Sequence, residues 1–335
     1  MGKMKKGIAV AGSLIADTFY EIDTYPKQGM LTNIRDTVKN IGGTGNMILD
    51  LAKLDAGLPV KVSAVIGSDE NGKMLRERLS VYPNIDQSNL TEEGSSSETL
   101  VMNARDTKQR TFFYHPAASD IFDESYIDWD KTDADIFHLE YLLSMAKVDA
   151  AEEPFGTHGA RILHEAKRRG MKTSIDMVSE QSERAQRIVT CALKYTDYCS
   201  INEVEAEAAT GIEIIKGGRV DEEMIKTALL KLHELGVSTW AVIHSPVCSY
   251  GYDCMQEEYI RVPSLKLPPG YIKGTNGAGD AYCSGILYGA YRHDSLAEAM
   301  RLAAACAVCS LSAVNGTDGM RSYRDVKEEE KRLSQ

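Results

Sequence analysis

The order of the apolar segments in the second half of the chain constrains the fold most strongly. From residue 135 onward, short apolar runs alternate with longer segments that carry apolar residues at helical spacing. Strands are predicted at 136–139, 173–176, 198–201 and 239–243, and helices at 157–169 and 222–235. Strands that alternate with helices form a mostly parallel sheet with helices on both faces. The sequence therefore predicts an α/β fold.

Four short strand-like segments interrupt this alternation. They cover residues 18–22, 31–39, 99–103 and 110–115, and the first two flank a turn that contains Pro26 and Gly29. We expect them to form a separate small sheet. The predicted division is an α/β domain of residues 1–16, 40–98 and 118–335, with a small β-domain of residues 17–39 and 99–117.

Composition and charge exclude several classes of protein. A hydrophobic content of 43% and a charged content of 26% are typical of a soluble globular protein of 335 residues. The net charge of −11 argues against nucleic acids and anionic membranes as partners, because both require clustered Lys and Arg. No apolar run is long enough to span a membrane. The seven scattered cysteines, including Cys306 and Cys309 in one apolar run, favour buried thiols in a reducing cytoplasm over a zinc site.

Gly277-Ala278-Gly279-Asp280 stands directly before an apolar, helix-compatible segment. Small residues leave backbone N–H groups uncovered, and a helix N-terminus adds unpaired donors and a partial positive charge. Together they favour an anion site, beside which Asp280 could accept the proton of an attacking hydroxyl. The alternative is a flexible loop followed by a helix whose first turn carries an Asp to complement the dipole.

The longer run, Gly274-Thr275-Asn276-Gly277-Ala278-Gly279-Asp280, resembles the C-terminal signature of the PfkB (ribokinase-like) carbohydrate kinase family. Gly42, Gly43 and Asn46 reproduce the Gly-Gly-x-x-Asn pattern of its N-terminal signature. The resemblance extends over nearly the whole chain. It implies a ribokinase-like three-layer sandwich with a β-lid, and an ATP-dependent kinase that phosphorylates a primary hydroxyl of a small sugar or sugar derivative.

The resemblance also implies roles for particular residues. Asp280 would be the general base, and the backbone amides of Gly277, Ala278 and Gly279 the anion hole. The acceptor would contact Asp17, Gly42, Gly43, Asn46 and Glu140, of which Asp17 and Glu140 follow predicted strands at ligand-facing ends. ATP would contact Asn202, Gly251, Thr275, Asn276, Gly277, Gly279 and Asn315. Asn202 and Glu205 would hold Mg²⁺, although their spacing also fits a helix capping box.

The chain departs from the family pattern at several positions. Ser245 and Pro246 replace an expected glycine, and we expect the preceding His244 to pack at a strand end. Gly274 removes a side chain near a loop that binds a monovalent cation in some members, which counts against a K⁺ site. Asp176 ends a strand but lacks the family's Asp-x-Asn-x-Arg continuation, so we do not assign it to the site.

Two alternatives remain open on the sequence. A nucleoside kinase of the same family would use lid aromatics to stack on a base, from the set Phe19, Tyr20, Phe112, Phe113 and Tyr114. A non-catalytic sugar-binding regulator would fit the altered residues 245–246 and 274, but the presence of Asp280 argues against it. The resemblance further implies a homodimer formed through the lid.

Overall fold

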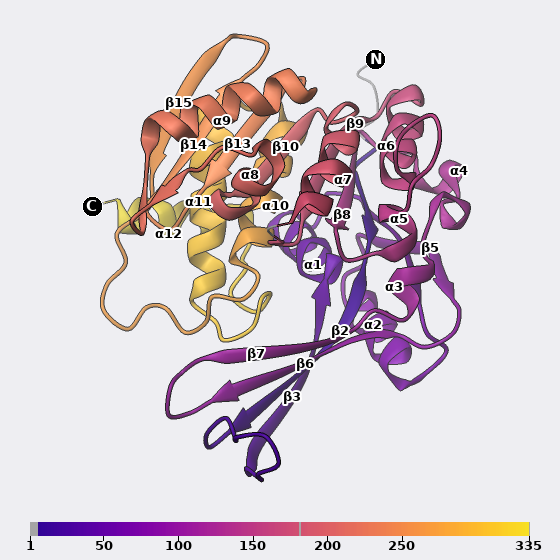
Figure 1. Cartoon of the computed structure of the whole chain (residues 1–335), viewed down its shortest axis with the longest axis vertical. Coiled ribbons are helices and arrows are strands. Elements are labelled where there is room, and N and C mark those ends of the chain that lie inside the picture. The colour runs from indigo at the N-terminus through magenta and orange to yellow at the C-terminus, as the bar shows by residue number, and fades with distance from the viewer. Residues whose placement is uncertain (1–5, 181, 335) are drawn as a thin grey trace.

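A nine-stranded sheet forms the centre of the molecule (Figure 1). The computed structural model describes residues 6–180 and 182–334; the predicted α/β domain also includes residues 1–5, 181 and 335, which lie outside the described residues. Across the sheet the strands are β15 (Glu258–Pro263), β14 (Cys248–Asp253), β13 (Trp240–His244), β10 (Tyr198–Asn202), β9 (Lys172–Met177), β8 (Ile136–Leu142), β1 (Ile8–Gly12), β4 (Val60–Ile66) and β5 (Ile85–Glu92). Only the β13–β14 and β14–β15 pairs are antiparallel, so the predicted mostly parallel sheet is confirmed.

Helices cover both faces of this sheet, and alternate strand residues face each layer. In β1, Ile8 and Val10 join one hydrophobic cluster, whereas Ala9 and Ala11 join the other. The first layer contains α1 (Thr44–Leu54), α2 (Glu70–Ser80), α10 (Ala278–Arg292), α11 (Leu296–Leu311) and α12 (Tyr323–Leu333). The second contains α3 (Ala118–Ile121), α4 (Trp129–Thr132), α5 (Ala146–Asp149), α6 (His158–Arg168), α7 (Glu183–Leu193), α8 (Glu203–Thr210) and α9 (Glu222–Leu235).

A second sheet, which we call the lid, projects from this body (Figure 1). Its order is β3 (Ile34–Gly43), β2 (Leu14–Ile22), β6 (Ser97–Ala104) and β7 (Arg110–His115). β2 and β3 are longer than predicted at the end near the body. β2 follows β1 almost without interruption, and β3 runs directly into α1 at Thr44. The two strands therefore connect the lid to the centre of the molecule.

The remaining features agree with the apolar pattern of the sequence. A short hairpin precedes α9. Its two strands, β11 (Ile215–Lys216) and β12 (Arg219–Val220), have two residues each. Cys306 and Cys309 are buried free thiols in α11. Among the described residues, no helix is both long and apolar enough to cross a bilayer.

The close contact between α10 and α11 depends on glycine. A Cβ atom at Gly285 would lie 2.4 Å from Cα of Ala303, and one at Gly289 would lie 2.6 Å from Cβ of Ala299. We predict that Gly285→Val lowers the free energy of unfolding by about 1–3 kcal/mol, because the helices must separate to admit the side chain. Denaturant unfolding would measure this. The control Thr227→Val, at an exposed position of α9, should change stability by less than about 0.5 kcal/mol; an equal loss in both variants would contradict the packing argument.

Candidate active site

The N-terminus of α10 opens without a side-chain cap. Gly277 is the N-cap residue, its φ is 70°, and it makes no side-chain cap hydrogen bond. A Cβ atom at Gly277 would lie 2.6 Å from Cα of Gly316, so the positive φ and the close contact both require glycine. The uncapped amides and the helix dipole make this end suited to an anion.

A cavity of about 480 Å³ lies against this helix end, and we call it the α10 cavity. Ala278, Gly279, Thr275 and Asn202 contribute to its polar side. Its apolar wall comes from Leu265, Leu267, Ile272, Ala304, Ala307, Val308 and Leu311. A site with an apolar wall beside free amides suits a ligand that combines a flat ring with an anionic group.

Asp280, in the first turn of α10, is held by groups from two distant parts of the chain. Nδ2 of Asn46, in α1, donates to Oδ2 of Asp280 at 2.8 Å, and the hydroxyl of Tyr141, in β8, donates to Oδ1 at 2.5 Å. Asp280 is only 6% exposed. Burial raises the pKa of Asp280, and the hydrogen bonds from Tyr141 and Asn46 oppose that rise. The carboxylate is thus oriented and largely removed from water.

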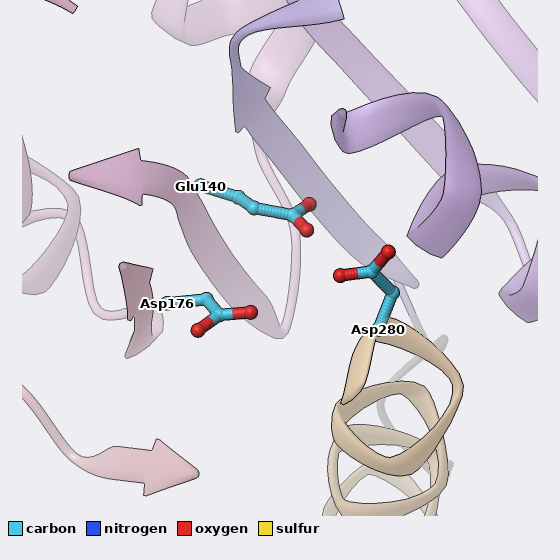
Figure 2. Close-up of side chains that lie close together, drawn as sticks. All are labelled: Glu140, Asp176 and Asp280. Atoms are coloured by element: carbon cyan, nitrogen blue, oxygen red, sulfur yellow. The ribbon is translucent and has the colours of Figure 1, made fainter. Parts of the chain in front are cut away.

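Glu140 and Asp176 point toward Asp280, so that ligand oxygens of all three side chains lie within 4.8 Å of one another (Figure 2). Neither carboxyl oxygen of Glu140 has a hydrogen-bond partner among the described residues, and Glu140 is fully buried. Burial and then the charges of Asp280 and Asp176 raise the pKa of Glu140. Because three buried carboxylates cannot all ionise together, Glu140 is the group best placed to hold a proton.

Asp17, at the start of the lid, lies next to this cluster. A Cβ atom at Gly42 would lie 2.2 Å from Oδ2 of Asp17, so only glycine allows β3 to approach that carboxylate. Burial raises the pKa of Asp17 to about 7; a hydrogen bond with Thr99 opposes the rise and the charge of Asp280 adds to it. Gly43, with φ 58°, then begins α1 and brings Asn46 to Asp280.

Asn202 and Glu205 form the capping box at the start of α8. Glu205 accepts hydrogen bonds from the backbone N–H of Asn202 at 2.9 Å, from its Nδ2 at 2.6 Å and from the hydroxyl of Ser179 at 2.7 Å. Burial raises the pKa of Glu205 to about 7, against these hydrogen bonds. With three acceptor positions occupied, Glu205 has little capacity left for a direct metal bond, but it can still bind a metal-bound water.

Of the predicted nucleotide residues, Asn202, Thr275 and Gly279 line the α10 cavity, whereas Gly251, Asn276, Gly277 and Asn315 do not. Gly251 lies inside β14, where a Cβ atom would come 2.6 Å from Sδ of Met300, and it does not line the cavity. Asn315 lines a different cavity, between the lid and the body. His244, at the end of β13, lines the α10 cavity and packs on Tyr282 with a ring-centroid distance of 4.7 Å. Burial lowers the pKa of His244 to about 4, so its ring is neutral at pH 7.

Sequence reasoning missed three residues of this site. Asp176 was left out because the residues after it do not match the family motif, although its position at a strand end was a usable signal. Tyr141 gave no signal, because its contact with Asp280 spans 139 residues. Asp50, one turn after Asn46 in α1, is fully buried with both oxygens unpartnered; burial and then the charge of Asp280 raise its pKa.

The pKa of Asp17 predicts an unusual pH dependence of stability. Its carboxyl binds a proton more tightly in the folded state, with a pKa of about 7 against 3.8 when unfolded, so its stabilising contribution is present at low pH and is lost as pH rises through 7. We expect Asp17→Asn to be more stable than wild type at pH 8, by roughly 1–4 kcal/mol, and to lose more than half of that advantage at pH 5. Thermal and urea unfolding at both pH values would measure this. The exposed control Asp86→Asn should show no such pH-dependent difference.

Comparisons with known proteins agree with this geometry. The model of the family described as "pfkB family carbohydrate kinase" matches residues 5–322. No curated protein matches the chain in sequence. Among solved structures, the chain is similar to Arabidopsis thaliana ribokinase in complex with ribose and ATP, with 21% identity, a TM-score of 0.79, and coverage of 98% of this chain and 99% of that one.

Two further structures have comparable similarity. A Methanocaldococcus jannaschii nucleoside kinase, described as an archaeal member of the ribokinase family, has 18% identity, a TM-score of 0.74, and coverage of 99% and 100%. A Xylella fastidiosa fructokinase with bound ATP has 18% identity, a TM-score of 0.76, and coverage of 99% and 100%. The ribokinase-like fold expected from the sequence is confirmed. The chain belongs to the pfkB family of carbohydrate kinases and is a phosphotransferase that uses an alcohol group as acceptor.

Proposed function

We propose that the protein transfers the γ-phosphoryl group of ATP to a primary hydroxyl of a small sugar or sugar derivative, with Asp280 as general base. The observation that supports this most directly is the position of the Asp280 carboxylate. It lies in the first turn of α10, next to uncapped backbone amides, and is oriented by Asn46 and Tyr141. A base beside an anion site is what transfer of a phosphoryl group to an alcohol requires.

In the proposed reaction, Asp280 accepts the proton of the acceptor's CH₂OH group as its oxygen attacks the γ-phosphorus. The amides of residues 276–279 stabilise the negative charge on the transferring group. Because Asp280 is buried and already positioned, little reorganisation is needed at the moment of transfer. Closure of the lid over the acceptor would exclude water, which otherwise could hydrolyse ATP.

The α10 cavity is the proposed ATP site, with the adenine ring against its apolar wall and the phosphates toward Gly279 and Thr275. Mg²⁺, when bound with ATP, would neutralise phosphate charge. Asn202 and Glu205 fit such an ion through water, because the hydrogen bonds of the capping box already occupy most of the Glu205 acceptor positions. K⁺ is not part of the proposal: Gly274 offers no side chain and packs against the carbonyl oxygen of Val314.

The acceptor would lie between Asp17, Asn46 and Glu140. A carboxylate can accept hydrogen bonds from two neighbouring hydroxyls, and the unpartnered oxygens of Glu140 are available for a sugar hydroxyl. Gly42 and Gly43 contribute backbone without side chains, which keeps this space open. All of these groups lie near Asp280, so an acceptor whose primary hydroxyl is placed at Asp280 would contact them.

A nucleoside is the second candidate acceptor. Strand register places Phe19, Phe112 and Tyr114 on the same lid face as Asp17, while Tyr20 and Phe113 face the other way. Up to three aromatic rings could therefore stack on a base. The opposite face of the lid, on which Phe113 is 49% exposed, fits the predicted lid-to-lid dimer.

A cytoplasmic location remains a prediction from the cysteine content.

The first experiment measures ADP release with Mg-ATP against pentoses, hexoses, sugar acids, sugar phosphates and nucleosides. Asp280→Asn should lower kcat by on the order of 10²-fold or more for the acceptor that wild type uses, because the amide cannot accept the proton. ATP binding, measured by calorimetry, should persist. The exposed control Asp86→Asn should retain wild-type kcat. Turnover near the wild-type value in Asp280→Asn would remove the base from the mechanism.

Tyr141 gives a second prediction, on the pH profile. Its hydroxyl lowers the pKa of Asp280, so Tyr141→Phe should raise that pKa. The base must be ionised to act, and the acidic limb of the kcat/KM profile should therefore move to higher pH, with kcat reduced by about tenfold at neutral pH. Steady-state kinetics between pH 5 and 9 would show this. A uniform loss of rate with no displacement of the acidic limb would indicate a purely structural role for Tyr141.

A further inference from the structure

A second cavity, of about 500 Å³, lies between the inner face of the lid and the body, and we call it the lid pocket. Lys273, Val314 and Asn315 line it from the body, next to the loop that leads to Asp280. From the lid, its lining residues are Phe19, Glu21, Asp36, Val38, Asn103, Ala104, Arg105, Lys108 and Arg110. The pocket therefore joins the loop before α10 to the outer part of the lid.

Strand register places the lid pocket on the same sheet face as Asp17. Along β2, Phe19 and Glu21 follow Asp17 at intervals of two residues and share its face. Glu21 pairs with Asn103 of β6, and Asn103 pairs with Arg110 of β7. At about 3.3 Å per residue, Phe19 and Glu21 lie roughly 7 and 13 Å from Asp17 along the strand. The pocket thus lies farther out on the lid face that carries Asp17, a residue of the proposed acceptor site.

The lid pocket is unusually basic for a chain with a net charge of −11. Four of its lining residues are cationic and two, Glu21 and Asp36, are acidic. Arg105 is partly neutralised by Glu21, at 3.6 Å. The side chains of Lys108, Arg110 and Lys273 make no ion pair with any described residue. Unpaired cations around a cavity attract an anionic ligand, and Arg in particular suits carboxylate or phosphate.

The inner end, at the proposed acceptor site, and the outer end, at the lid pocket, therefore differ in charge. The inner end is acidic, with Asp17, Glu140 and Asp280, and suits hydroxyl groups. The outer end is basic. Building on the proposed kinase function, we propose that the acceptor is an anionic sugar derivative: its primary hydroxyl lies at Asp280, and a carboxylate or phosphate at its other end lies in the lid pocket between Arg110 and Lys273.

The test compares three acceptors that share a free terminal primary hydroxyl: a neutral sugar, the sugar acid with a carboxylate at carbon 1, and the sugar 1-phosphate. We expect kcat/KM to be at least about tenfold higher for one of the two anions than for the neutral sugar. The preferred anion then distinguishes carboxylate from phosphate. Preference for the neutral sugar or for a nucleoside would overturn the inference.

Two substitutions from different segments locate the anion. Arg110→Gln and Lys273→Gln should each raise KM for the anionic acceptor by about tenfold with kcat changed by less than about twofold, and should leave KM for the neutral sugar unchanged. Lys39→Gln is the matched control, because it removes a positive charge from the opposite face of the same lid sheet. Equal effects of Lys39→Gln and both pocket variants would overturn the assignment. Thermal unfolding would verify that all variants are folded.

Calorimetry separates this inference from the proposed function. Wild-type protein saturated with ADP should bind the sugar acid or the sugar 1-phosphate, and Arg110→Gln and Lys273→Gln should weaken that binding by about tenfold. Anion binding without phosphoryl transfer would contradict the proposed reaction and support the lid pocket. Transfer to a neutral sugar, with no anion binding in calorimetry, would support the reaction and overturn the anionic acceptor.

Discussion

The burial of the Asp280 carboxylate is the constraint on which the site depends. A carboxylate removed from water is costly unless its oxygens are hydrogen-bonded, and here Asn46 and Tyr141 supply the bonds. These donors come from α1 and β8, so both elements must lie close to the start of α10. Glycines make the approach possible: Gly277 packs on Gly316, which in turn packs on Asn46. The position of the base is thus a property of the whole α/β body.

The acidic groups around Asp280 impose a cost on the folded state. Asp17, Glu140 and Asp176 are buried near the same point, and burial raises the pKa of each. Unfolding returns these carboxyl groups to water, where they ionise more easily. The free energy of unfolding is therefore lower at a pH at which they must ionise in the folded state. Such an arrangement is expected at a site that receives a ligand, because substrate hydroxyls can supply the hydrogen bonds that the protein leaves unmade.

Sequence reasoning succeeded where structure follows local spacing, and it failed at long-range contacts. The capping box of Asn202 and Glu205, the glycine before α10 and the mostly parallel sheet all appear as predicted. The length of β2 and β3 was underestimated, because both strands continue directly into elements of the body. Asp176 was excluded because its neighbours differ from a motif, yet strand geometry alone directs its side chain toward Asp280. For Asp176, the family motif argued against a place in the site, whereas its position at the end of a strand argued for one.

The sequence by itself determined the α/β class, the small second sheet and the uncapped, glycine-led helix end, because each is encoded in residues a few positions apart. Only the tertiary structure decided which side chains of the site contact one another. Asn46 and Asp280 are separated by 234 residues, and Tyr141 and Asp280 by 139. The basic lid pocket likewise combines residues of all four lid strands with Lys273 and Asn315. Charges so distant in the chain become one electrostatic environment only when folding brings the lid and the body together.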